Sequence, residues 1–143
     1  MKSIRPIWQP TSIILADWRA KSMSRVMVRI SPQACVDIAD TLRFTEVRLG
    51  ESVRNRYEDL LQETLIALAE QPTPVDSKMR DEISPGLRSL NLSFNVLLMT
   101  DGRVIKPRHI VFYRTGTDQI VEILRVLHDA MEVAQNLKHL HQQ

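Results

Sequence analysis

Two runs of apolar residues between residues 107 and 128 dominate the pattern of hydrophobic positions along the chain. The first run covers residues 110–113 and the second covers residues 120–127, and both are rich in β-branched and aromatic side chains. The polar break between them contains Gly116, and this arrangement predicts a β-hairpin. Because both runs are nearly continuous, the hairpin strands should be covered on much of both faces, which places them in the middle of a sheet.

A short strand is predicted at residues 26–30, and helical spacing of apolar residues follows it. Ser31 and Pro32 are favoured as the cap and the first residue of a helix, and Gly50 is favoured just after its end. We therefore expect this helix to run to about Leu49. Its apolar face repeats at steps of three and four residues: Ile38, Leu42, Thr45 and Leu49.

A second helix is predicted from Glu51 to about Ala69, because Pro72 and Pro74 end it. The short connection should make the two helices antiparallel neighbours. One stripe of this helix has the spacing of a buried face: Val53, Tyr57, Leu60, Leu61, Thr64, Leu65 and Leu68. Charged residues are expected to form its solvated face: Arg54, Arg56, Glu58 and Asp59.

The remaining segments complete an α+β architecture. Residues 73–83 are polar and predict a loop, a strand follows from about Leu87 to Leu92, and residues 94–106 predict a small extra hairpin or an extended strand pair. A short C-terminal helix is expected over residues 130–140. The order of elements predicts an N-terminal strand and a two-helix antiparallel hairpin on a mainly antiparallel sheet of four strands.

Length and composition limit the classes of protein to which this chain can belong. The 143 residues suit one domain, and the apolar fraction of 43% is ordinary for a globular chain. Residues 1–24 lack a clear period, so we expect a disordered N-terminal extension followed by a single domain over residues 25–143. No apolar run approaches the roughly 20 residues of a membrane span. A cytoplasmic protein without a membrane role fits these features.

Chemistry-bearing motifs are scarce in this sequence. The single cysteine, Cys35, allows no internal disulfide and lacks the spacing of a metal site. The sequence also contains no phosphate-binding loop and no nucleophilic triad. We therefore expect neither a metal nor a cofactor. The net charge of +2 does not by itself demand a nucleic-acid partner.

Three pieces of sequence carry a family resemblance when they are taken together. They are Ser-Pro-Gln-Ala at residues 31–34, Pro-Gly-Leu-Arg-Ser at 85–89, and the hairpin segments 108–114 and 122–128. Their joint order and spacing resemble the ParE branch of the RelE/ParE toxin family. The extension and the long segment between residues 91 and 106 depart from the family pattern.

The resemblance implies a RelE/ParE-like fold and a toxin of a type II toxin–antitoxin, or plasmid stabilisation, system. ParE-type toxins are associated with inhibition of DNA gyrase, whereas RelE-type relatives cut messenger RNA on the ribosome. The implied antitoxin is a ParD-like DNA-binding protein, so contact with DNA is expected only through the toxin–antitoxin complex. An inactive homologue that serves only as a co-repressor is a further alternative.

Cations on and around the central hairpin are the candidates for binding the target or the antitoxin: Arg88, Arg108, Arg114, Arg125 and His128. Among these, His128, Arg125 and Arg114 are also candidates for RNA cleavage, which needs proton transfer and positive charge near the phosphate. A structural role is the alternative: Arg88 and Arg125 can pair with carboxylates such as Glu122. In the absence of a bulge, strand alternation puts Arg125 and His128 on opposite faces. We therefore favour a protein-binding toxin over an enzyme.

Overall fold

The computed structural model describes residues 12–16, 25–130 and 137. Six strands form its main sheet: β1 (Ser12–Ala16), β2 (Arg25–Ile30), β3 (Ser77–Met79), β4 (Arg88–Asn91), β7 (His109–Thr115) and β8 (Val121–His128). Their order is β1-β2-β8-β7-β4-β3, and β2–β8 is the one parallel pairing among these strands. The predicted α+β class is confirmed, with β1 and β3 as edge strands beyond the four expected.

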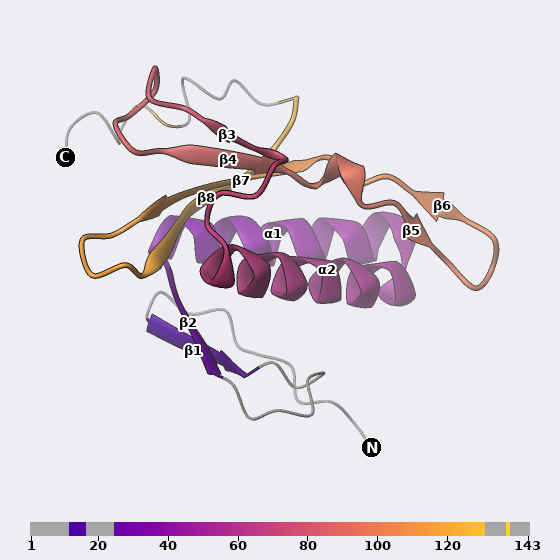
Figure 1. Cartoon of the computed structure of the whole chain (residues 1–143). Helices are drawn as coiled ribbons and strands as arrows, with labels where there is room; N and C mark the ends of the chain where they lie inside the picture. The colour runs from indigo at the N-terminus through magenta and orange to yellow at the C-terminus, as the bar shows by residue number, and fades with distance from the viewer. Residues whose placement is uncertain (1–11, 17–24, 131–136, 138–143) are drawn as a thin grey trace.

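Helices α1 (Pro32–Leu49) and α2 (Glu51–Glu70) lie side by side on one face of the sheet (Figure 1). The Ala34 amide donates a hydrogen bond of 3.0 Å to Ser31 Oγ, which caps α1 as predicted. Gly50 separates the helices with a φ of 98°, a conformation that favours glycine. Ser31 therefore fixes the start of α1, and Gly50 marks the boundary between α1 and α2.

The central hairpin is covered on both faces, as its apolar runs predicted. Between the helices and the sheet, Leu61 and Leu65 of α2 are fully buried in a cluster that includes Val111 and Tyr113 of β7. A smaller cluster on the opposite face contains six buried residues: Ile83, Leu87, Phe112, Leu124, Leu127 and Leu137. The position of β7 and β8 in the sheet centre follows from these two cores.

The helix faces differ from expectation at Glu58 and Leu49. Glu58 is 1% exposed, and its carboxylate lies 3.8 Å from the Arg54 guanidinium, so it does not belong to a solvated face. Gln62, one turn further along α2, is buried as well. The covered face of α2 is therefore wider than its apolar stripe. Leu49, by contrast, is 37% exposed at the end of α1.

The predicted loop at residues 73–83 contains strand β3, so that prediction is wrong for Ser77–Met79. This strand pairs antiparallel with Arg88–Leu90 of β4. Three residues that are exposed or half-buried are too few to produce an alternating pattern of apolar and polar positions. The strand therefore depends on its pairing with β4 rather than on a sequence signal of its own.

Residues 94–106 form the small extra hairpin that was one of the two expected alternatives, and we call them the arm. The 3-10 turn η1 (Leu92–Phe94) leads into β5 (Leu97–Leu98), which pairs with β6 (Val104–Ile105). The arm extends past the ends of the helices (Figure 1). Leu97 and Ile105 join the main core, whereas Leu98 and Val104 are 70% and 64% exposed. One face of the arm is thus anchored and the other is open.

Strand β1 lies within the segment that was expected to be a disordered extension, and it pairs antiparallel with β2 over five residue pairs. Residues 1–11 and 17–24 lie outside the described residues. The predicted C-terminal helix over 130–140 does too, except for Ala130 and Leu137. Among the described residues, no helix has the length and apolar character needed to span a membrane.

Candidate functional site

Four of the five candidate residues separate into two groups near opposite ends of β7, and the fifth, Arg125, is paired with Phe112 between them. Arg108 immediately precedes this strand, and His128 pairs with its first residue, His109. Arg114 lies near the other end, where Arg88 of β4 is paired with the neighbouring Tyr113. Six steps of extended strand between Arg108 and Arg114 correspond to about 20 Å. A single small ligand cannot contact both groups.

A polar cluster, which we call the histidine cluster, joins the sheet to both helices at the first end: Thr41, Tyr57, His109 and His128. The His109 ring places Nδ1 2.7 Å from Tyr57 Oη of α2 and Nε2 3.3 Å from Thr41 Oγ1 of α1. His128 packs edge-on against His109, with 5.3 Å between the ring centroids. Sequence reasoning missed His109, although its pairing with His128 follows from the hairpin itself.

Burial controls the protonation of this cluster. The pKa of His109 is lowered from 6.5 to about 4, mainly by burial and to a smaller extent by the nearby His128. Burial also raises the pKa of Tyr57. His109 is therefore neutral near pH 7, and a neutral imidazole has one donor and one acceptor nitrogen for its two hydroxyl partners. These bonds hold the sheet against α1 and α2.

Arg108 and His128 are tied to the turn that follows β8. The Arg108 guanidinium lies 3.0 Å from the Asp129 carboxylate, and the Asp129 amide donates to the Arg108 carbonyl at 2.8 Å. His128 Nδ1 accepts a hydrogen bond of 3.1 Å from the Ala130 amide. His128 therefore hydrogen-bonds the turn that follows the hairpin. The positive charge at this end is therefore balanced in part by Asp129.

Arg125 makes a nearly enclosed ion pair with Asp37 of α1. Its Nε and Nη2 atoms donate to the two carboxylate oxygens at 2.8 and 3.0 Å, and the Val126 amide donates to the same carboxylate at 2.9 Å. The Arg125 and Asp37 side chains are only 13% and 12% exposed. Glu122, the partner suggested from sequence, instead lies 3.5 Å from Arg29.

A β-bulge lies in β8 just before Arg125, but it does not change the predicted placement of Arg125 and His128 on opposite faces. The pairing of β7 with β8 shifts between Phe112 and Tyr113, so alternation fails at Leu124, whereas the pairs from Arg125 to His128 follow it. Leu124 and Leu127 show the effect, since both belong to the smaller core although alternation would separate them. Arg125 is paired with Phe112 of the smaller core, and its guanidinium reaches Asp37 of α1. His128 is paired with His109, which is hydrogen-bonded to α1 and α2.

The remaining two candidates support the edge of the sheet. Arg88 Nη2 donates to Ser77 Oγ of β3 at 2.7 Å, and its buried Nε atom has no hydrogen-bond partner in the described part of the chain. Arg114 is paired in register with Glu122 of β8, and its side chain passes beside Gly86. Within the described ranges, no three metal-ligating side chains gather into a group that could hold an ion.

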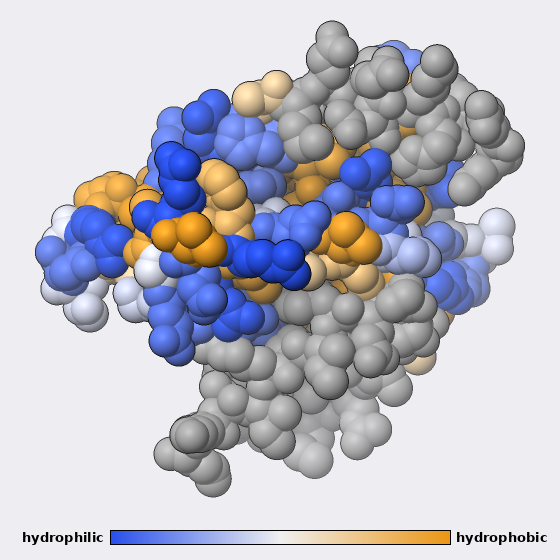
Figure 2. Space-filling view, turned by 180° about the vertical axis from the view of Figure 1, so that it is seen from behind, coloured by the Kyte–Doolittle hydropathy of each residue, from blue (hydrophilic) through white to orange (hydrophobic). Residues whose placement is uncertain are grey.

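Exposed apolar side chains are concentrated on α1 and the arm. Val36, Phe44 and Val47 of α1 are 56%, 61% and 78% exposed. The arm adds four more exposed apolar side chains: Phe94, Val96, Leu98 and Val104. Figure 2 shows the α1 side of the molecule, where apolar atoms lie among hydrophilic ones. These side chains are open to solvent, whereas Arg88 and Arg125 are held by contacts within the fold.

Acidification should lower the stability of the folded chain because of His109 in the histidine cluster. Below pH 6.5 the unfolded chain protonates residue 109, whereas the folded chain resists this down to about pH 4, so stability should fall across that window. We expect His109 to account for a loss of about 1 kcal/mol between pH 7.5 and 5.5. Denaturant unfolding of the wild type and His109→Gln measures this difference, with His128→Gln as the control. Equal pH dependence in wild type and His109→Gln would contradict it.

Residues 28–133 match the family model described as the ParE toxin of type II toxin-antitoxin system, parDE. This chain belongs to the ParE toxin family. A relative, Toxin ParE1 of Caulobacter vibrioides, is 30% identical over 109 residues, which cover 76% of this chain and 95% of the relative. The family resemblance noted in the sequence is confirmed. The match begins inside β2, so β1 and the preceding residues lie outside it.

Proposed function

We propose that this ParE-family chain acts as a toxin by binding and inhibiting DNA gyrase, and that a ParD-like antitoxin encoded beside it neutralises it. The observation that carries the proposal is the exposed apolar surface of α1 and the arm. Exposed apolar side chains that gather on a few elements of a small domain are typical of protein-binding surfaces. Family membership supplies the toxin class, and the surface favours action by binding.

The geometry of the candidate cations favours binding over catalysis. Arg125 is held by Asp37, and His128 Nδ1 is occupied by a backbone amide. General acid–base catalysis requires groups within hydrogen-bond reach of one reacting centre. His128 is opposite His109, and five steps of strand, about 17 Å, separate His109 from Arg114. The three candidates for RNA cleavage therefore do not form such a set.

Ribosome-dependent RNA cleavage is the second candidate function because of one exposed pair. The side chains of Arg108 and His128 are 60% and 37% exposed at the same end of β7. An imidazole and a guanidinium at one surface can supply a proton carrier and a positive charge. Asp129, which contacts both, reduces that charge and favours the binding proposal over this one.

One set of assays separates these functions. The chain is expressed alone, and growth, gyrase supercoiling and messenger-RNA cleavage are measured side by side. We expect growth inhibition and loss of supercoiling with intact RNA, together with rescue by the neighbouring antitoxin gene and co-purification of its product. Cleaved RNA with normal supercoiling would favour the enzyme, and normal growth would favour a co-repressor.

The arm offers a direct test of target binding. Replacing Leu98 and Val104 with aspartate should weaken gyrase inhibition by at least about tenfold, because charge replaces apolar contact surface. Their exposure predicts an unchanged unfolding midpoint. Val75→Asp is the matched control, since Val75 is fully exposed outside the arm. Full inhibition by the Leu98→Asp/Val104→Asp chain would exclude the arm from the target surface.

A further inference from the structure

Strand β1 occupies a sheet edge that the family match does not include. The match starts at residue 28, whereas β1 pairs with β2 from Ser12↔Arg29 to Ala16↔Arg25. On its other side, β2 pairs with β8 only from Val28 to Ile30. Within the described residues, the first three residues of β2 therefore have β1 as their one strand partner.

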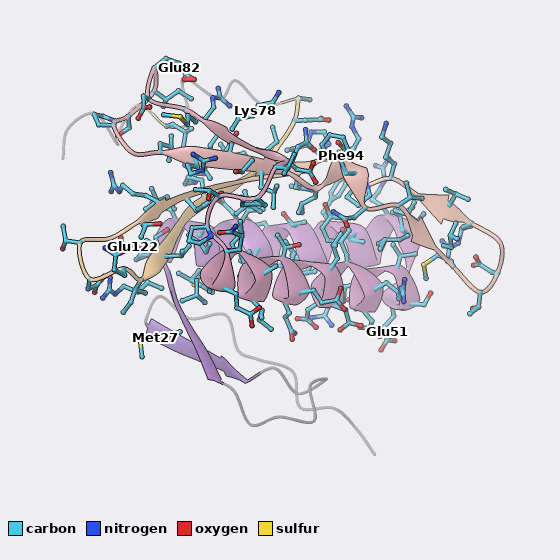
Figure 3. All side chains as sticks on the ribbon, in the orientation of Figure 1. Met27, Glu51, Lys78, Glu82, Phe94 and Glu122 are labelled. Carbon is cyan, nitrogen blue, oxygen red and sulfur yellow. The ribbon has the colours of Figure 1, made fainter. Side chains whose placement is uncertain are left out.

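Within the β1–β2 ribbon, β1 is the strand with the weaker support, because it lies at the edge of the sheet beside β2. The ribbon extends away from the helices and the other strands in Figure 1, and Figure 3 shows Met27 on this ribbon, pointing away from the helices. The Met27 side chain is accordingly exposed, at 44%. The buried side chains of Val28 and Ile30 anchor β2 in the main core, whereas β1 has β2 as its one neighbour in the order of the described strands, and a two-stranded pairing is by itself marginally stable in water. Among the strands of the main sheet, β1 is thus well placed to be displaced.

An open β2 edge would present unpaired backbone donors and acceptors in extended geometry. Such edges bind an additional strand, with backbone hydrogen bonds giving affinity and side chains giving selectivity. The strand now seated there reads Ser-Ile-Ile-Leu-Ala, which is rich in β-branched residues. This sequence shows the chemistry that the edge accepts.

We propose that the outer edge of β2 is a docking site for an extended, β-branched segment of a partner protein, and that β1 occupies this site as an internal competitor. The partner's segment replaces β1 strand for strand, so β1 sets how readily the partner binds. This proposal concerns access to the sheet edge and does not depend on gyrase being the target.

The test uses the full-length chain with Ile13→Pro and Ile14→Pro together. Adjacent amides of a strand point to opposite sides, so one of these two faces β2, and proline removes both donors. Ile4→Pro with Ile7→Pro is the matched control outside β1. The probe is a fluorescent synthetic peptide with the sequence of residues 10–18, and the same peptide carrying both prolines is its control.

We expect the Ile13→Pro/Ile14→Pro chain to bind the probe at least about tenfold more tightly than the wild type or the control chain. Amide exchange in β2 should speed up in this variant and slow again when the probe is added, while β8 is unchanged. The proposal is overturned if all chains bind alike, or if β2 amides are exposed and the probe still does not bind. Dimerisation of the variant instead of probe binding would also overturn it, because the edge would then serve a second copy of the chain.

Discussion

Replacing Asp37 with alanine is expected to lower the free energy of unfolding by about 3 kcal/mol. The Asp37 carboxylate accepts hydrogen bonds from the Arg125 guanidinium and from the Val126 amide, and all of these contacts are largely shielded from water. Replacing Asp37 leaves the charged Arg125 guanidinium without its carboxylate partner at a site with little solvent access. It also removes the partner of a backbone donor beyond the end of β2, where β8 has no strand neighbour on that side among the described residues.

Chemical denaturation measures this effect, with Asp40→Ala as the matched control on an exposed position of the same helix. The control should change stability by no more than about 0.5 kcal/mol. Asp37→Ala combined with Arg125→Met should recover part of the loss, because a buried charge is then no longer left behind. Equal effects of Asp37→Ala and Asp40→Ala would mean that the ion pair adds little to stability.

This role changes the interpretation of Arg125, which the sequence presented as a candidate for target or antitoxin contact. Loss of toxicity in an Arg125→Ala chain would not by itself indicate a binding residue, since the same change disrupts the junction of α1 with β8. A stability measurement must accompany any such result. Arg108, at 60% exposure, is the more informative position for surface contacts.

The sequence predicted the elements whose signals are local. Ser31 and Pro32 determine where α1 begins, Gly50 separates the two helices, and the apolar runs around Gly116 specify the central hairpin. Each signal acts within a few residues of the feature that it determines. The family resemblance then indicated how these elements are combined.

Features that depend on tertiary contacts were not predictable in this way. The bulge in the hairpin shifts the alternation of side chains along β8, and no turn residue in the sequence indicates it. Burial of Glu58 depends on what covers α2 beyond its apolar stripe. Strand β3 needs β4 as a partner, and the carboxylate that meets Arg125 comes from a residue 88 positions earlier in the chain. Long-range pairing of this kind leaves no periodic trace in the sequence.

Replacing Leu61 or Leu65 with alanine should lower the free energy of unfolding by about 2–5 kcal/mol, the cost typical of buried leucines. Both side chains have no exposed surface, and both belong to the core that joins the helices to the sheet. Each replacement leaves a cavity that the closely packed helix pair cannot close by local collapse, so the cavity adds to the lost burial.

Leu98→Ala in the arm is the matched control, because it makes the same chemical change at a residue that is 70% exposed. Its cost should stay within about 0.5 kcal/mol. Denaturant titrations of the three variants give the comparison directly. A Leu98→Ala chain less stable than the Leu61→Ala chain would mean that the arm, rather than the α2 face, holds the helices to the sheet.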